Sequence, residues 1–441
     1  MSGPVADEDA GWGPEQAEIR ALAKPLNTPR DLDGLVRLAG SARFVCLGEA
    51  SHGTHEYYRW RALLSRRLIE EHGFTWIGVE GDWPDCWRIN RWVRGEADQE
   101  LDARQLLAGF ERWPTWMWAN HEVAAFLTWL REWNLGLPGH RRTGFYGLDV
   151  YSLWDSLREI FNWLGANAAD ALPAALRAWQ CFVPFREDPQ RYAWSNRLVP
   201  QPCEEDVVAL LAEVHRRTLG RTHEDPSAFD AVQNAIVAAN AERYYRTMIR
   251  GDQQSWNIRD HHMSDTIGRL ARHHGFGSKG LVWAHNTHVG DARATDMADD
   301  GMVNIGQLVR QRHPGTSVLV GFSSFTGSVT AAPAWGSPEQ AMDVPRAAPG
   351  SHEQILNQAL AGPAALVFDS DRSGPWLSSW RGHRAIGVVY NPDRERGNYV
   401  PTVMGKRYDA VVWFPRTMAL RPLHHEHRPT EPELETEPTG F

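Results

Sequence analysis

Histidine and carboxylate side chains recur in this sequence directly after short runs of apolar, β-branched and aromatic residues. Glu49 and His52 follow the first of these runs, three residues apart, within the segment GEASHG (residues 48–53). Histidine is the side chain best suited to move protons near neutral pH, and a carboxylate beside it fixes its tautomer and raises its basicity. We therefore predict that His52 is a general base, and that Gly48 and Gly53 allow the tight turn that brings Glu49 against it.

Three further apolar runs end in side chains of the same kind. These side chains are, in chain order, Glu80, Asp82, Asp149, His285 and His288. In open α/β sheets, ligands bind beyond the carboxyl ends of the parallel strands. If the four runs are neighbouring parallel strands, we expect their polar side chains to meet at one rim of the sheet, with Asp149 contacting the substrate.

The histidines and glutamates of this rim suit the hydrolysis of an ester by activated water. Either Glu49 or Glu80 could hold His52 in the tautomer that accepts a proton from water. His285 and His288, facing the other side of the ester carbonyl, could stabilise the developing oxyanion or protonate the leaving alkoxide. All five side chains are therefore predicted to be catalytic.

The spacing of His285 and His288 leaves a metal site open as an alternative. Two histidines with nearby carboxylates could hold a divalent cation, but no H-E-x-x-H pattern accompanies them, so we predict no metal and no other cofactor. The sequence also lacks a G-x-S-x-G nucleophile elbow, a G-x-x-x-x-G-K-[ST] phosphate loop and a G-x-G-x-x-G pattern after the first strand. Ser51 is therefore disfavoured as a nucleophile.

Three of the 21 tryptophans, Trp113, Trp116 and Trp118, form a cluster after the second run. Side chains three or four residues apart share a face of a helix, whereas those two apart do not, so the three indoles cannot all face one core. We predict that Trp116 lines a cavity for a bulky, partly apolar substrate. The alternative is that these tryptophans belong to the core.

The elements that must position these side chains alternate between strand and helix, which is typical of an α/β fold with a mainly parallel sheet flanked by helices. A helix over 56–71 separates the first two strands and ends at the His72-Gly73 pair. The predicted strands are 43–47, 76–80, 143–148, 280–284, 317–322, 365–368, 384–389 and 408–414.

Leucine, alanine and tryptophan recur at helical spacing from 152 to 272, with no convincing strand. We therefore predict that 152–272 is a helical insertion, or cap, between the third and fourth core strands. The α/β catalytic core then comprises 31–151 and 273–423, after a polar segment over 1–30. The tail 424–441, rich in Pro, Glu and Thr, is predicted to be disordered.

The composition of the chain limits the kinds of partner that we expect it to bind. The net charge of −9 comes without a basic stripe, which argues against nucleic acid. The acidic start is unlike a signal peptide, and no run of about 18 apolar residues occurs, so we predict a cytoplasmic protein without membrane contact. The four cysteines show no C-x-x-C spacing, from which we predict neither a disulfide framework nor a cysteine zinc site. The predicted partner is a small ester or lactone, and no oligomeric state is predicted.

Five blocks of this sequence resemble the erythromycin esterase family. They are GEASHGTHEYYRWRALLSRRLIEEHGF, VEGDWPD, FYGLDVYS, SWNIRDHHM and WAHNTHVGDA, and in order they span roughly 43–415. The resemblance implies an α/β fold with a helical elaboration, and metal-independent or weakly metal-linked ester hydrolysis in which a histidine activates water for attack on a macrolide lactone.

The residues of these blocks also match the positions that carry function in the family. The resemblance places the general base at His52, with Glu49 near it and Glu80 at a strand end. The helix arginine falls on Arg61, expected to pair with a carboxylate of the substrate site, and the histidine pair falls on His285 and His288.

Two functions of other classes remain as alternatives to an esterase acting on a carboxylic ester or macrolide-like lactone. One is a binding protein for haem or another planar ligand, which tryptophan walls would suit. The other is an acyl-transfer or tailoring enzyme of secondary metabolism, in which the acyl group passes to an acceptor other than water.

Overall fold

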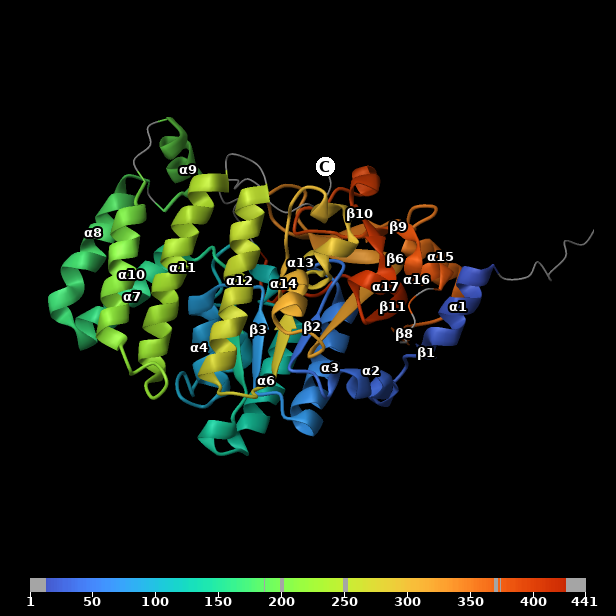
Figure 1. Cartoon of the computed structure of the whole chain (residues 1–441), viewed down its shortest axis with the longest axis horizontal. Helices are drawn as coiled ribbons and strands as arrows, with labels where there is room; N and C mark the ends of the chain where they lie inside the picture. Colours follow the sequence, from blue (N-terminus) through green and yellow to red (C-terminus); the bar gives the residue numbers. More distant parts are fainter. Residues whose placement is uncertain are drawn as a thin grey trace, which may run out of the picture.

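The computed structural model describes residues 13–185, 187–198, 202–248, 253–368, 372 and 374–425. In these residues the strands form a nine-stranded mixed sheet in the order β1-β8-β11-β6-β2-β5-β3-β4, with β7 paired to β6, and a separate two-stranded sheet of β9 and β10. The strands are β1 (Ala23–Pro25), β2 (Phe44–Leu47), β3 (Trp76–Val79), β4 (Gly144–Gly147), β5 (Gly280–Trp283), β6 (Ser317–Ala331), β7 (Gln340–Val344), β8 (Ala364–Val367), β9 (Trp380–Arg384), β10 (Tyr399–Val403) and β11 (Ala410–Thr417). The predicted α/β class with a mostly parallel sheet is confirmed (Figure 1).

Helices cover both faces of this sheet (Figure 1). Alternate residues of a strand point to opposite faces, and β2 divides its side chains in this way. Val45 and Leu47 pack in one apolar core with α3 (His55–His72) and α6 (His121–Leu135). Phe44 and Cys46 pack in a second core with α12 (Gln253–His273) and α14 (Ile305–Arg312). Because β2 is buried on both faces, its sequence is apolar throughout instead of alternating.

The helices of the core and of the segment after β4 are as follows. They are α1 (Pro14–Leu22), α2 (Asp33–Ala39), α3 (His55–His72), α4 (Trp83–Val93), α5 (Ala103–Leu107), α6 (His121–Leu135), α7 (Leu153–Asn167), α8 (Leu172–Phe182), α9 (Pro189–Leu198), α10 (Glu204–Thr218), α11 (Pro226–Met248), α12 (Gln253–His273), α13 (Asn286–Val289), α14 (Ile305–Arg312), α15 (His352–Ala359), α16 (Pro375–Ser378) and α17 (Met404–Arg407). The predicted end of α3 is confirmed, because Gly73 adopts the left-handed conformation with φ of 69°.

Helices α7 to α12 lie between β4 and β5 in the chain and form the left part of Figure 1. Most of them share an apolar core of their own, which extends from Val150 to Met248. The last of them, α12, packs against both α11 and α14 and so joins this helical insertion to the sheet. The helical segment between the third and fourth core strands is thus an appended layer that α12 anchors to the core, with further contacts from α11 and α7 to α4.

The expected strand over 384–389 is wrong. Strand β9 ends at Arg384 and pairs with β10 in the small sheet. Beyond it the backbone N–H groups of Ala385, Ile386 and Tyr390 donate to three different segments of the chain, so no continuous ladder forms. The apolar composition of residues 384–389 was therefore not sufficient to predict a strand.

The expectation that the cysteines form no disulfide is also wrong. Cys181 at the end of α8 and Cys203 at the start of α10 are disulfide-bonded, whereas Cys46 and Cys86 are free and buried. The two bonded residues are 22 positions apart, and the packing of α8 against α10 brings their Cα atoms to 5.8 Å. No local spacing pattern reveals such a pair.

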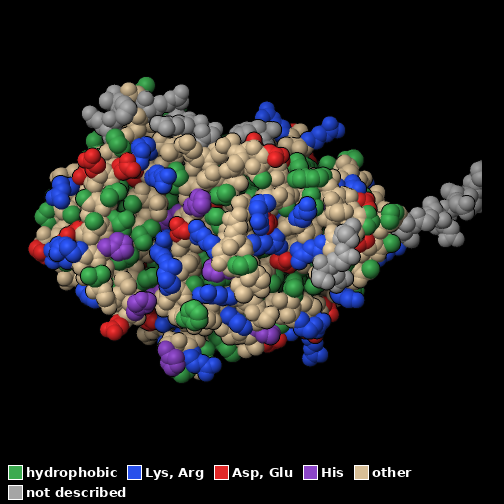
Figure 2. All heavy atoms as spheres, in the orientation of Figure 1, with side chains coloured by type: hydrophobic (Ala, Val, Ile, Leu, Met, Phe, Trp, Pro, Cys, Tyr) green, Lys and Arg blue, Asp and Glu red, His purple; other side chains and the backbone are tan. Residues whose placement is uncertain are grey.

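Two other sequence-based predictions concern the ends and the surface of the chain. Most of the tail predicted to be disordered, from 426 onward, lies outside the described residues. Among the described helices, none is both long and apolar enough to cross a membrane. The face drawn in Figure 2 carries basic side chains interspersed with acidic and hydrophobic ones. The cytoplasmic location stays a prediction.

Candidate active site

Four neighbouring parallel strands deliver the candidate residues to one rim of the sheet. Strand β5 lies between β2 and β3, and β4 pairs with the other side of β3. Their carboxyl ends are followed by Glu49 and His52, by His285 and His288, by Glu80 and by Asp149. The adjacency on which the predicted site depends is therefore present.

His52 is hydrogen-bonded to Glu49. His52 Nδ1 donates to Glu49 Oε1 at 2.9 Å, and both side chains are almost completely buried. With the proton on Nδ1, the lone pair that can accept a proton is on Nε2. Arg61 Nη2 lies 3.1 Å from Glu49 Oε2 and its guanidinium packs on Trp283, so the predicted pairing of Arg61 with a carboxylate is present.

Gly48 and Gly53 are required at the ends of this turn for close approach. A Cβ on Gly48 would lie 2.0 Å from the side-chain oxygen of Asn286, and one on Gly53 would lie 1.8 Å from the carbonyl oxygen of Thr330. Gly48 and Gly53 are not among the described glycines that have a positive φ. The expected need for glycine is met, but its cause is packing against α13 and β6.

Glu80 is held by three different groups. Its Oε1 accepts from Arg259 Nη2 at 2.7 Å, and its Oε2 accepts from the backbone N–H of His285 at 2.8 Å. The Nε2 of His288 lies 3.4 Å from Oε1. Burial would raise the pKa of Glu80, but the nearby positive charge, first of all that of His288 and also that of Arg259, outweighs burial and holds this pKa well below its usual range. Glu80 is therefore an anion that links β3 to β5.

His288 is a buried cation. Its Nδ1 donates to Asp260 at 2.9 Å, and its ring stacks on Trp256 with 4.5 Å between centroids. Burial lowers the pKa of His288, but Asp260 and Glu80 outweigh burial and raise the pKa to about 10. His288 thus lies behind Glu80 and orients it, instead of facing the cleft as expected.

His285 faces the general-base candidate. The ring centroids of His52 and His285 are 4.9 Å apart. His285 Nδ1 lies 2.8 Å from the hydroxyl of Thr287 and accepts the N–H of Thr287 at 3.3 Å. This N-cap bond orients the ring toward His52.

A small cleft of about 50 Å³ reaches His52 from the surface. Its polar wall includes Glu80, Asp149 and Arg259. Arg259 Nε donates to Asp149 Oδ1 at 3.0 Å and Nη2 to Asp149 Oδ2 at 2.8 Å, so Asp149 orients this guanidinium. The apolar wall is Phe110, Pro114, Met117, Trp118, Trp335 and Val388.

Trp116 does not line this cleft, and its predicted contact with the substrate is wrong. The side chain is completely buried in the core that packs on α3 and α6. Trp118 lines the cleft instead, and its Nε1 donates to the carbonyl of Glu80 at 3.0 Å. Arg61, predicted to meet the substrate, also lies behind the cleft wall.

Asp82 and Asp85 add acidity at the mouth of the cleft. Asp82 forms an ion pair with Arg112. Burial and, to a lesser extent, the neighbouring charge of Asp82 together raise the pKa of Asp85 to about 7. Asp85 therefore changes charge near neutral pH within reach of the site.

Two residues of the site, Arg259 and Asp260, were not singled out from the sequence. Both lie on α12 of the insertion, and Asp260 binds the N–H of Ile305 as well as His288. Asp260 occupies the apolar stripe of this helix, which otherwise comprises Trp256, Met263, Ile267 and Leu270. A charged residue at a core position of an amphipathic helix is the signal that could have found them.

Metal binding by the histidine pair has little geometric support. Among the residues that the structure describes, no three His, Cys, Asp or Glu side chains are grouped as ligands for an ion. The Nδ1 of His288 is hydrogen-bonded to Asp260, and its Nε2 lies 3.4 Å from Glu80, so both ring nitrogens face carboxylates.

Comparison with known proteins identifies the family. A profile of the erythromycin esterase family matches residues 69–417, which is most of the chain. The chain belongs to the erythromycin esterase family. The matched residues contain Glu80, Asp149 and the histidine pair, whereas Glu49 and His52 precede them.

Relatives of known sequence or structure extend this result. Erythromycin esterase type II of Escherichia coli is 22% identical over 329 residues, which cover 70% of this chain and 75% of that protein. A solved structure of a succinoglycan biosynthesis protein has a TM-score of 0.74 at 20% identity and covers 95% of this chain and 100% of its own. A histidine-to-asparagine mutant of the erythromycin esterase EreC, in its open conformation, has a TM-score of 0.66 at 17% identity over 89% of this chain and 95% of that chain. The structural likenesses show the shared fold, and family membership supports a hydrolase.

Proposed function

We propose that this protein hydrolyses a carboxylic ester or lactone with a water molecule activated by His52. The observation that carries the proposal is the hydrogen bond from His52 Nδ1 to Glu49, at the inner end of a cleft. It holds the imidazole in the tautomer whose Nε2 can accept a proton from water. Arg61 positions Glu49 from the opposite side.

His285 and Arg259 would stabilise the negative charge that develops on the carbonyl oxygen of the ester. The ring of His285 lies against that of His52, and Arg259 lines the cleft. Asp149 and Glu80 hold the Arg259 guanidinium in place, so its charge needs no reorganisation when the oxyanion forms. His288 acts through Glu80 and is a positioning residue in this mechanism.

We propose that no metal takes part. This proposal is supported by the ion pairs that occupy His288 and by the hydrogen bonds at Nδ1 of His285. Dialysis against a strong chelator should leave activity largely intact, with well under one divalent metal per chain by elemental analysis. Loss of activity together with a stoichiometric metal would reassign the two histidines as ligands.

A macrolide-like lactone is among the substrates proposed. Phe110, Met117, Trp118 and Trp335 provide an apolar surface that a large acyl group or ring could cover. The cleft of about 50 Å³ holds only one or two water molecules, whereas sites for drug-sized ligands occupy roughly 300–1,000 Å³. The cleft walls must therefore move for a bulky substrate to enter.

Hydrolysis in ¹⁸O-labelled water tests the proposal directly. A panel of esters and lactones is incubated with the protein, and the acid product is analysed by mass spectrometry. One ¹⁸O atom in the carboxylate, absent with His52→Ala, is expected. Formation of a new ester when an alcohol acceptor is added would indicate acyl transfer instead, and no product from any ester or lactone would contradict the assigned reaction.

A further inference from the structure

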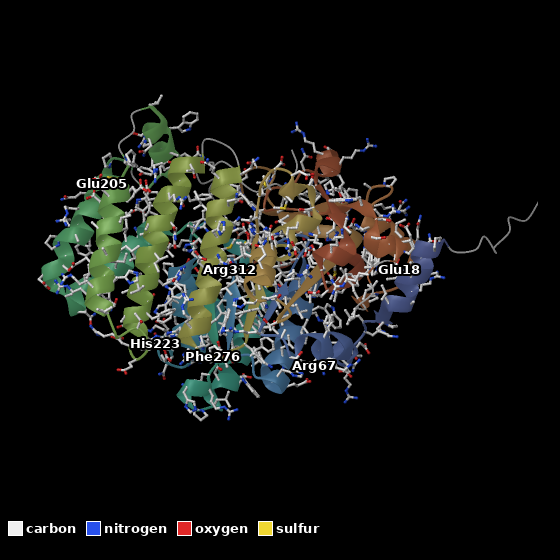
Figure 3. The ribbon with its side chains drawn as sticks, viewed as in Figure 1. Glu18, Arg67, Glu205, His223, Phe276 and Arg312 are labelled. Carbon is white, nitrogen blue, oxygen red and sulfur yellow. A yellow bond between two sulfur atoms is a disulfide. The ribbon has the colours of Figure 1, made fainter. Side chains whose placement is uncertain are left out.

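A second cavity of about 320 Å³ lies between α3 and α6, and it shares no lining residue with the cleft. We call it the α3–α6 groove and define it by His55, Arg59, Leu63, Glu122, Phe126 and Trp129. Figure 3 labels Arg67 of α3 low in the view, away from Glu205 of the insertion. Both helices belong to the α/β core, and α3 is the helix that follows the His52 turn.

The floor of the groove is apolar and aromatic. Phe126 and Trp129 are three residues apart on α6, so they share one face of the helix, and their ring centroids are 5.5 Å apart. Leu63 of α3 closes the floor from the other side. The volume is within the range of pockets for small organic ligands.

Glu122 supplies an unsatisfied hydrogen-bond acceptor. Its side chain is 6% exposed, and Oε1 accepts from His55 Nδ1 at 2.6 Å. Its Oε2 is buried and has no hydrogen-bond partner among the described residues. A buried carboxylate oxygen without a donor is costly, so this atom points to a ligand that carries an N–H or O–H group.

The rim of the groove carries uncompensated positive charge. Arg59 and Arg421 line it, and neither forms an ion pair with a carboxylate in the part of the chain that the structure describes. Arg66 pairs with Glu70 and covers the ring of Trp129 at 5.0 Å. Guanidinium groups without acidic partners favour a carboxylate or sulfonate.

We propose that the α3–α6 groove is a binding site for a small aromatic acid that also carries one hydrogen-bond donor. The ring body lies on Phe126 and Trp129, and the acid group meets Arg59 and Arg421. The N–H or O–H group donates to Glu122 Oε2. The ring, the acid group and the hydrogen-bond donor of the ligand would thus each contact a different feature of the groove.

Three related probes separate these contributions. We would measure binding of 6-hydroxy-2-naphthoate, 2-naphthoate and 2-naphthol to the full chain by isothermal titration calorimetry. The hydroxynaphthoate should bind about tenfold more tightly than either the acid without the hydroxyl or the alcohol without the acid, because each lacks one polar contact. Equal affinity for all three, or no binding of any, would overturn the proposal.

Three variants of groove residues test where the probes bind. Arg59→Ala should remove the advantage of hydroxynaphthoate over naphthol, and Glu122→Leu should remove its advantage over naphthoate. Ala125→Trp, which places an indole at the wall of the groove, should abolish binding of all three. Arg141→Ala, at an exposed arginine outside both cavities, is the matched control and should change nothing. Should Glu122→Leu fail to fold, Arg59→Ala and Ala125→Trp still decide, and unchanged binding in both would overturn the proposal.

Discussion

His52 is the side chain on which the proposed chemistry depends. Its imidazole is held by Glu49, so replacing His52 with alanine removes the base and leaves the Glu49–Arg61 ion pair in place. His52→Ala should lower turnover by about 10² to 10⁴, the scale expected for loss of positioned proton transfer. Steady-state kinetics with the best substrate of the ester panel would measure this change.

Ser51→Ala is the control for this variant. The Ser51 hydroxyl is buried and bonded to the hydroxyl of Thr54, which does not suit a nucleophile. The variant should keep appreciable activity. Complete inactivation, together with a trapped acyl-enzyme in the wild type, would favour a serine mechanism over the His52 base.

His288 makes stability depend on pH in a defined direction. Its pKa is raised from about 6.5 in the unfolded chain to about 10, so its proton stabilises the fold fully below pH 6.5. This stabilisation is lost as the pH rises through 10. The free energy of unfolding should fall between pH 7 and 10 by up to about 1.4 kcal/mol per pH unit.

Denaturant unfolding at several pH values tests this behaviour. His288→Gln should flatten the decline above pH 7, whereas His223→Gln, at an exposed histidine of the insertion, should leave it unchanged. An identical slope in wild type and His288→Gln would mean that His288 is neutral in the folded protein.

The short helix α13, which carries the histidine pair, is held from behind by Arg407. This arginine is completely buried, and its Nη2 donates to the carbonyl of Asn286 at 3.1 Å while Nη1 donates to Thr402 Oγ1 at 2.6 Å. No carboxylate pairs with it among the described residues. Arg407 is therefore a positioning residue for the turn after β5.

Arg407→Met should keep the fold and lower kcat. Methionine has a similar length, and the Asn286 carbonyl keeps the N–H of Gly290 as a donor, so the fold should persist, whereas the turn loses the hydrogen bonds through which Arg407 anchors it. We expect kcat to fall about tenfold with KM little changed, since an interaction of about 1–1.5 kcal/mol is lost. Arg407→Lys should recover part of the loss. A large drop in melting temperature with unchanged kcat would make Arg407 structural only.

The polar residues that follow the strands were easier to predict than the pairing of the strands. Strands β2, β3, β4 and β5 are short apolar runs that are each followed by a polar turn, and this contrast is visible locally. The run over 384–389 is also largely apolar, but beyond Arg384 it forms only isolated bridges, because pairing depends on the rest of the fold. Trp116 and Trp118 lie in the same apolar core, contrary to the expectation from their spacing, and only Trp118 also borders the cleft.

The molecule consists of an α/β core and an insertion that has an apolar interior of its own, and the two are joined through α12 and α11. Arg259 and Asp260 make this joint part of the active site, because they reach Glu80 and His288 from the insertion. Displacing α12 would therefore change the charges around the rim and the width of the cleft together.

The disulfide between Cys181 and Cys203 should stabilise the insertion selectively. It closes a loop of 22 residues, which corresponds to roughly 3 kcal/mol in a chain-entropy treatment. Reduction should speed amide hydrogen exchange in α8 and α10 while β2, β3 and β5 stay protected, because the insertion has an apolar interior of its own. The double variant Cys181→Ser/Cys203→Ser should exchange in the same way with and without reductant. Equal acceleration throughout the chain would show that core and insertion unfold as one unit.

The sequence was sufficient for the α/β class, the family resemblance and the rim residues, because buried strands and the polar turns after them are local patterns. It was also sufficient to pair His52 with Glu49, three residues away, as one of two possibilities. The choice between Glu49 and Glu80, the position of Arg259 and the disulfide needed the folded chain. Arg259 and Glu80 are 179 residues apart, and packing of α12 against the sheet brings them to 2.7 Å. Contacts between distant segments depend on how whole layers pack, and no short-range pattern in the chain encodes that geometry.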